Sequence, residues 1–386
     1  MDYFKALVTD APFIITLFWA ITVGASMVKH KDWYKVPLFV FLSFSMIALL
    51  AGSAFLRGNF DLFRWLYFPA SFMALSMFPT YYLYITSLTS EKPLTLRKWA
   101  KHLFIPFIHA AFAGVIFLVI MDKSDRIFWI EQCLTEEVQP EGLYRIAFLM
   151  DNYFRKLFLV LAIAYYALTD RKIFNHRTRL SSYFSNTEQA DIRWFPVIRV
   201  SFFFTLLAAF FHFTSSRLAT LEHEILPMVS YSLLSIFFWV TGYFSQSQRI
   251  IYPPENADSG LQAGEPASLS KEQYTFLAGQ LDKIMEEQKI FTQRDLTLPG
   301  LSRMLGTNRT YLSKLFNEHL HISFNHYINQ KRVDYITQLL DESIIDKDIR
   351  DLWVMCGFNS ASSFYRWFHI FKGTSPMAYR ERAGKK

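Results

Sequence analysis

Long apolar stretches dominate the first two thirds of the chain. Seven of them precede residue 245, and two, Val36–Leu56 and Trp65–Ser90, contain no charged residue. Each of these two is long enough to cross a hydrocarbon core of about 30 Å. The pattern predicts a helical membrane domain of seven spans within residues 1–248. The spans are expected at Pro12–Val28, Val36–Leu56, Trp65–Leu88, Leu103–Met121, Phe154–Leu168, Phe195–Phe213 and Leu226–Phe244.

The fifth stretch is the shortest of the seven. Its uncharged part, Leu157–Thr169, covers only about 20 Å as a helix. Arg155 and Lys156 must therefore lie in the outer part of the membrane if this stretch crosses it.

The pattern changes after the seventh stretch. Residues 249–269 include Pro253–Ser268, which is rich in Pro, Gly, Ser and Ala and predicts a flexible linker. Ser270 and Gln273 then have the spacing of a capping box. The helix that they open should bury Leu277, Leu281, Ile284 and Met285 on one side. Residues 270–386 are thus expected to form a second, polar helical domain.

Leu298–Phe316 predicts two short helices joined by a tight turn. Leu301, Met304 and Leu305 form one apolar face, and Gly306 tolerates the positive φ that follows a helix end. Thr307 is expected to cap the next helix, whose Leu312, Leu315 and Phe316 repeat the same spacing. Its opposite face is polar or basic without an acidic residue, which is typical of a helix that lies against DNA.

The same plan recurs in Ile349–Phe368, where Gly357 takes the place of Gly306. The intervening Ser323–Asp341 carries a helical apolar face and would span about 28 Å. A helix of that length can hold two reading helices in successive major grooves, which lie about 34 Å apart. The whole chain is therefore predicted to be all-α, with a cytoplasmic domain of two helix-turn-helix units.

Three segments of this domain resemble the AraC/XylS-type DNA-binding family. They are Leu298–Phe316, Phe324–Arg332 (FNHYINQKR) and Gly357–Arg380 (GFNSASSFYRWFHIFKGTSPMAYR). Two positions depart from the family pattern: Trp353 replaces a small residue, and His369 stands where a lysine is common. The resemblance covers roughly Leu269–Arg382 and implies contact with double-stranded DNA. The residues it implicates are Asn308, Arg309, Thr310, Ser313, Lys314, Ala361, Ser362, Ser363, Tyr365 and Arg366.

Composition supports a membrane protein. Of 386 residues, 52% are hydrophobic and only 19% are charged, which is too apolar for a soluble two-domain chain. The odd-numbered loops carry twelve Lys and Arg residues, against seven in the N-terminus and the even-numbered loops. By the positive-inside rule the N-terminus lies outside and the C-terminal domain in the cytoplasm. This predicts a multi-pass protein of the bacterial inner membrane. Cys133 and Cys356 then lie on opposite sides, and whether Cys133 pairs between molecules stays open.

Polar groups inside a membrane are costly and are therefore candidates for function. Some of them are expected to line a ligand pocket; the alternative is that each one is satisfied by a neighbouring helix or the membrane surface. Asp151 and Arg155 have the spacing of a helical ion pair. The tyrosines at 81, 82, 84, 165 and 166 are interpreted as an interfacial belt rather than a binding cage. The candidate ligand-binding residues are Asp151, Arg155, Arg199, His212 and His109.

The motifs exclude several enzyme classes. The chain has neither a GxxxxGK[ST] loop nor an HExxH motif, and its seventh stretch lacks a lysine for a retinal Schiff base. No catalytic residue, metal or cofactor is expected. The predicted function is that of a membrane-bound one-component transcriptional regulator, acting as a homodimer on promoter DNA. Coupling is expected through the last span and the linker. The alternatives are a transporter, or a receptor for another membrane protein, with an attached regulatory domain.

Overall fold

The computed structural model describes residues 2–90, 93–134, 140–186, 222–247, 270–341 and 349–383, with 196–197, 199–200, 202–204 and 206–207. It divides into two compact units. The first comprises Met1–Ile173 and Ile192–Gln248, and the second comprises Phe174–Asp191 and Arg249–Lys386. The described residues are helical apart from turns, loops and one isolated bridge, between Phe184 and Thr297. The all-α prediction is confirmed.

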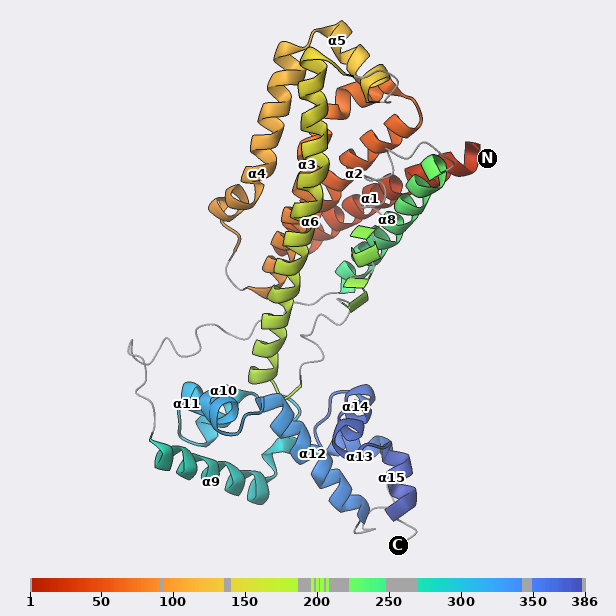
Figure 1. Ribbon diagram of the computed structural model, residues 1–386. Coiled ribbons are helices and arrows are strands. Elements are labelled where there is room, and N and C mark those ends of the chain that lie inside the picture. Colours follow the sequence, from red (N-terminus) through yellow and green to blue (C-terminus); the bar gives the residue numbers. More distant parts are fainter. Residues whose placement is uncertain are drawn as a thin grey trace. The chain divides into compact units, whose positions relative to one another are not determined.

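The first unit is a bundle of long apolar helices (Figure 1). Helix α1 packs between α2 and α8, α2 packs on α3, and α3 packs on α4. Turns of π-helix, η2 and η3, follow α4 and α5. The elements are α1 (Asp2–His30), η1 (Trp33–Lys35), α2 (Val36–Leu56), α3 (Phe60–Thr89), α4 (Leu96–Gly114), η2 (Val115–Ile120), α5 (Lys123–Phe128), η3 (Trp129–Cys133), α6 (Gly142–Tyr183) and α8 (Glu222–Ser247).

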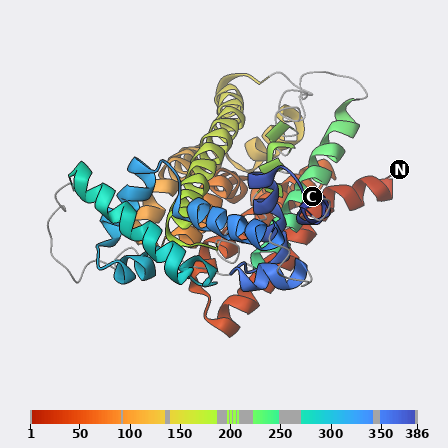
Figure 2. The same cartoon turned by 90° about the horizontal axis from the view of Figure 1, so that it is seen from below.

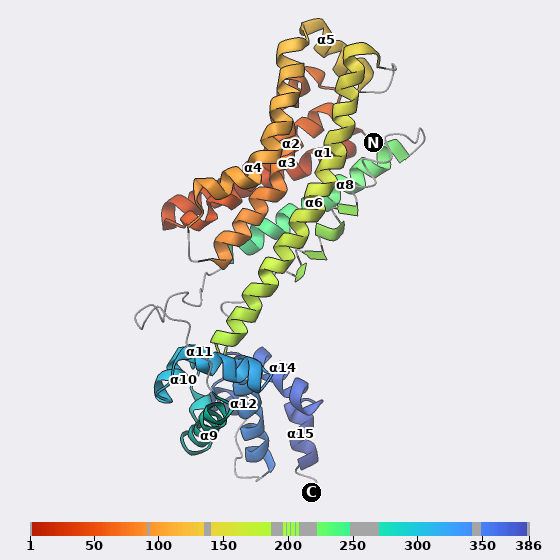
Figure 3. The same cartoon turned by 60° about the vertical axis from the view of Figure 1, so that its left-hand side comes forward.

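Helix α6 joins this bundle through aromatic contacts. Its Phe158 ring lies 5.1 Å from Phe78 of α3, and its Tyr165 hydroxyl lies 3.0 Å from Nδ1 of His102 on α4. The sequence predicted a span that ends near residue 168, followed by a loop. Instead α6 continues as one helix of 42 residues, about 63 Å long, to Tyr183. Figure 3 shows its uninterrupted course.

Four stretches of the described chain are long and apolar enough to cross a membrane, judged by length and composition. They are Tyr3–His30, Trp33–Leu56, Leu96–Ile120 and Met228–Gln246. They correspond to the first, second, fourth and seventh predicted spans. The third and fifth predicted spans lie within α3 and α6, and the sixth lies largely outside the described residues. The outward face of α4 exposes Phe104, Phe107 and Phe112, a surface suited to lipid.

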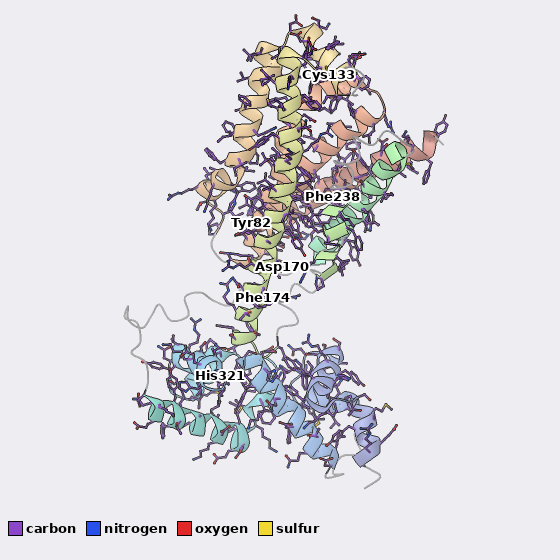
Figure 4. All side chains as sticks on the ribbon, viewed as in Figure 1. Tyr82, Cys133, Asp170, Phe174, Phe238 and His321 are labelled. Carbon is purple, nitrogen blue, oxygen red and sulfur yellow. The ribbon has the colours of Figure 1, made fainter. Side chains whose placement is uncertain are left out.

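Two of the tyrosines assigned to an interfacial belt lie elsewhere. Tyr81 and Tyr84 are buried, because α3 packs between α2 and α4 and turns this face into the bundle. Tyr82 (Figure 4) is partly buried, with its ring 5.8 Å from that of Tyr165. Cys133 is buried too, so its thiol is not presented for an intermolecular disulfide in this conformation.

The second unit contains the two predicted helix-turn-helix pairs, with α12 between them (Figure 2). One apolar core joins α9, α10 and α11 to the first half of α12, and another joins its second half to α13 and α14. The elements are α9 (Lys271–Gln288), η4 (Ile290–Thr292), α10 (Leu298–Met304), α11 (Arg309–Lys314), η5 (Leu315–His319), α12 (Phe324–Asp341), α13 (Ile349–Met355), α14 (Ala361–Lys372) and α15 (Pro376–Ala383).

Most local predictions for this unit are confirmed. Ser270 and Gln273 form the capping box of α9, and Gly306 and Gly357 have positive φ. Two details differ. Asn308, rather than Thr307, caps α11, because its side chain accepts a hydrogen bond from the Thr310 amide at 2.7 Å. Met304 is exposed, because α10 ends there and only Leu301 and Leu305 turn toward the core.

The two departures from the family pattern have different surroundings. Trp353 is partly buried against the core formed by α12, α13 and α14, so this core accommodates the larger side chain. His369 is exposed on α14.

Candidate DNA-binding surface and membrane-domain cavity

Helix α11 presents the first group of predicted DNA contacts. Arg309, Thr310, Ser313 and Lys314 are all partly exposed, while Leu312 on the opposite side is fully buried. The side chain of Asn308 caps α11 by accepting a hydrogen bond from the Thr310 amide at 2.7 Å. Backbone amides at a helix N-terminus favour a phosphate, and Arg and Lys add positive charge.

Helix α14 presents the second group. Ser362, Tyr365 and Arg366 are exposed, and the Arg366 guanidinium lies 5.6 Å from the centre of the Trp367 ring. Ala361 is partly exposed. Ser363 is buried, with its amide donating to the Ser360 hydroxyl at 3.2 Å. Its hydroxyl is therefore not available to a base in this conformation, and the remaining four residues form the accessible face.

The two helix-turn-helix units meet at a buried polar cluster that the sequence analysis missed. Arg332 of α12 is fully buried, and its Nε and Nη2 donate to the carbonyls of Phe291 and Gln293 at 2.6 and 2.8 Å. Burial lowers the pKa of Arg332 to about 9, so the guanidinium stays charged at neutral pH. The run FNHYINQKR contains the polar residues of this cluster on α12. The sequence analysis did not assign these polar positions to a face of the helix.

A short segment after α6 completes this cluster. We name Phe184–Asn186 the docking segment. Nη1 of Arg332 donates to Oδ1 of Asn186 at 3.0 Å, and the Ser185 carbonyl accepts from Asn325 at 2.6 Å and Asn329 at 3.0 Å. Nothing in the local sequence SSYFSN predicted these contacts, since the partners lie about 140 residues away along the chain.

The first unit contains a cavity of about 310 Å³. Its wall is mainly aromatic and aliphatic, with contributions from α2, α3, α4, α6 and α8. Two of the predicted ligand-binding residues, His109 and Asp151, line it. Asp151 Oδ2 accepts from Arg155 Nε at 2.8 Å, which confirms the predicted pair.

The other predicted ligand-binding residues lie apart from this cavity. Arg199 donates from Nε to the Tyr166 hydroxyl at 3.2 Å and forms an ion pair with Asp170 at 3.5 Å. His212 lies outside the described residues. The sequence analysis also missed Tyr81 and Tyr231, which line the cavity from α3 and α8. Within the described part of the chain, no group of three or more His, Cys, Asp or Glu side chains is arranged to hold a metal ion.

Comparison with known proteins concerns the second unit. Residues 301–382 match the family described as a helix-turn-helix domain. HTH-type transcriptional regulators of uncharacterised role from Staphylococcus aureus strains COL and MSSA476 are each 33% identical over 100 residues, which is 26% of this chain and 13% of theirs. The melibiose operon regulatory protein of Escherichia coli (strain K12) is 30% identical over 86 residues, which is 22% of this chain and 28% of that protein.

These matches leave most of each chain uncompared. The shared part is 13% of the length of the staphylococcal relatives, so their remaining regions say nothing about residues 1–269. No solved structure matches the chain.

Proposed function

We propose that this chain, whose residues 301–382 form an AraC-type helix-turn-helix domain, is a membrane-bound one-component transcriptional regulator. The observation that carries the proposal is the pairing of α11 and α14 on the single helix α12, in a chain that also contains a unit of long apolar helices. The paired helices offer basic and hydroxyl side chains for DNA. A homodimer is expected, because such domains usually bind repeated sites.

The membrane arrangement is part of the proposal. We infer seven spans, with the N-terminus outside and the second unit in the cytoplasm. The docking segment supports this orientation, because it follows the fifth predicted span and contacts α12 of the DNA-binding unit. A loop that contacts this unit must lie on the same side of the membrane as the unit itself.

The third part of the proposed function is sensing by the first unit. We propose that it binds a signal and thereby changes DNA binding by the second unit. The cavity supports a small molecule as the signal over a membrane-protein partner, because its volume lies in the range of ligand pockets, about 300–1,000 Å³.

The experiment that tests the proposal is genome-wide DNA occupancy of the full chain in cells. The test variant is Arg309→Ala/Lys314→Ala, on α11. The control is Lys271→Ala/Lys283→Ala, which removes the same charge from exposed positions of α9. Discrete promoter peaks should appear with the natural sequence, persist in the control and fall about tenfold or more in the test variant. Peaks that persist equally in both variants would contradict the assignment of α11.

A further inference from the structure

The cavity of the first unit has two buried polar side chains without partners. His109 is 8% exposed and Tyr81 is 5% exposed. Among the residues that the structure describes, none forms a hydrogen bond with either ring nitrogen of His109 or with the Tyr81 hydroxyl. Buried polar groups are normally hydrogen-bonded, so a wall that leaves both unsatisfied is suited to a ligand that supplies the partners.

The rest of the wall limits what that ligand can be. Phe41, Phe154 and Phe158 line the cavity, and the Phe154 ring lies 5.5 Å from that of His109. The Asp151 carboxylate is already held by Arg155, so it does not call for a cationic ligand. A sugar or an ion would leave most of its polar surface against aromatic rings. A flat apolar molecule with one polar group can pack against the aromatic rings and supply a hydrogen-bond partner to the unsatisfied polar side chains.

We propose that this cavity binds a small aromatic molecule carrying one hydroxyl or carbonyl group, which is hydrogen-bonded by His109. This inference rests on the proposed sensing function and names its ligand class. The source is a diffusible molecule rather than a membrane lipid, because the wall is largely aromatic and its unsatisfied His109 and Tyr81 match one small polar group. Neutral His109 can either donate to or accept from the polar group, through its two ring nitrogens.

The test uses 2-naphthol and naphthalene as fluorescent probes with the full chain in lipid nanodiscs. Saturable binding of 2-naphthol, above partition into empty nanodiscs, is expected. His109→Ala should weaken it about fivefold, the value of one hydrogen bond, and leave naphthalene binding nearly unchanged. Phe112→Ala, on the exposed face of α4, is the matched control. Ala74→Phe should abolish binding of both probes by filling the cavity.

Three results would overturn the ligand proposal. They are no saturable binding, equal binding in wild type and Ala74→Phe, or 2-naphthol binding only after a tightly held phospholipid has been extracted. None of these results affects the DNA occupancy experiment. The ligand proposal can therefore be wrong while the proposed regulator function stands.

A second inference comes from the docking segment. It rests on the proposed sensing function but not on which ligand the cavity binds. The Ser185 amide donates to the Leu296 carbonyl at 3.1 Å, which places the segment beside the residues that lead into α10. Asn186 Nδ2 donates to the carbonyls of Arg294 at 2.7 Å and Gly357 at 3.1 Å. Arg294 precedes the first helix-turn-helix unit, and Gly357 is the turn of the second. One asparagine therefore bonds to the residues that lead into the first helix-turn-helix unit, to the turn of the second and to α12.

The same segment is the direct continuation of α6. Asp170 and Phe174 (Figure 4) mark the last turns before it, and Asp151 lines the cavity on the same helix. We infer that α6, through the docking segment, carries the signal to the two helix-turn-helix units. A shift of α6 would displace the docking segment and so disturb its hydrogen bonds to Arg294, Gly357 and α12. This route differs from the predicted one through the last span and the linker. The last span is α8, and the linker lies outside the described residues.

The test compares Asn186→Ala with Asn175→Ala in the full chain. Asn175 is an exposed residue of α6 and serves as the matched control. Asn186→Ala should speed hydrogen exchange around Arg294–Thr297 and Gly357, and it should change promoter occupancy at least about fivefold. Asn175→Ala should change neither. Four glycines inserted after Asn175 interrupt α6 but keep the docking segment. Hydrogen exchange around Arg294–Thr297 and Gly357 should then stay slow, while promoter occupancy should change.

Two results would overturn the coupling route. One is faster exchange in Asn186→Ala with unchanged occupancy, which would make the segment a structural support only. The other is unchanged occupancy after the glycine insertion. In both cases promoter peaks would still be present, so the regulator function would stand.

Discussion

At the scale of single residues, two glycines in equivalent turns have different surroundings. Both have positive φ, +61° at Gly306 and +85° at Gly357. A Cβ at Gly306 would meet nothing within 4 Å, whereas one at Gly357 would lie 2.4 Å from the Thr292 carbonyl oxygen. The second turn is therefore packed against η4, and the first is open.

This difference predicts unequal costs for the same substitution. Gly306→Ala should destabilise the second unit by about 1 kcal/mol, the cost of a left-handed alanine. Gly357→Ala should cost about 3 kcal/mol or more, because backbone must also move. Hydrogen exchange of α13 and α14 in the full chain measures both. Equal effects of the two variants would show that the Thr292 contact is not maintained.

At the scale of elements, α12 and α14 meet at a histidine surrounded by aromatic rings. His326 lies 5.6 Å from the Trp367 ring and 5.0 Å from Phe371. Burial lowers the pKa of His326 below its ordinary value. The unfolded chain then binds the proton more readily than the folded unit, so stability is greatest above the unfolded pKa, about 6.5, and falls as the pH drops below it.

The second unit should have a lower melting temperature at about pH 5.5 than at about pH 7.5. His326→Gln should reduce this difference in melting temperature. Circular dichroism of the full chain in nanodiscs measures it. His369→Gln is the control, because that histidine is exposed on α14. If both variants change the pH dependence equally, burial of His326 is not the cause.

The two reading helices also differ in what they offer to DNA. Lys314 of α11 is partly exposed, and Arg366 of α14 is fully exposed. If each contacts a phosphate, alanine at either position should lower the slope of log affinity against log salt by about 1. Titration of the full chain with promoter DNA at several salt concentrations measures the slope. A change for Lys314→Ala alone would mean that the second unit contributes little charge to binding.

At the scale of the whole molecule, the proposed topology can be tested by labelling single cysteines in intact cells. Lys123→Cys, at the start of α5, should react with a membrane-impermeant maleimide, because the proposed topology places it in an outer loop. Lys98→Cys, near the start of α4, should react only after the membrane is opened. Native Cys133 is buried and should give a low background. The reverse pattern would invert the topology and place the DNA-binding unit outside.

Much of this protein was determined by its sequence alone. The periodic apolar positions specified α9 to α14 and their cores, because a helix must bury one face. The duplicated glycine turns specified the two helix-turn-helix units. Long uncharged runs likewise predicted the helices of the first unit. These features depend on residues that are close along the chain.

Only the tertiary structure brought distant residues together. It extended α6 well beyond its apolar run, and Ile173 and Leu180 in the added turns are buried. It gathered His109, Asp151 and Tyr81 around one cavity and excluded Arg199 from it. It also placed Asn186 against Arg332. Such contacts join positions up to 171 residues apart, and no local pattern encodes a hydrogen bond at that separation.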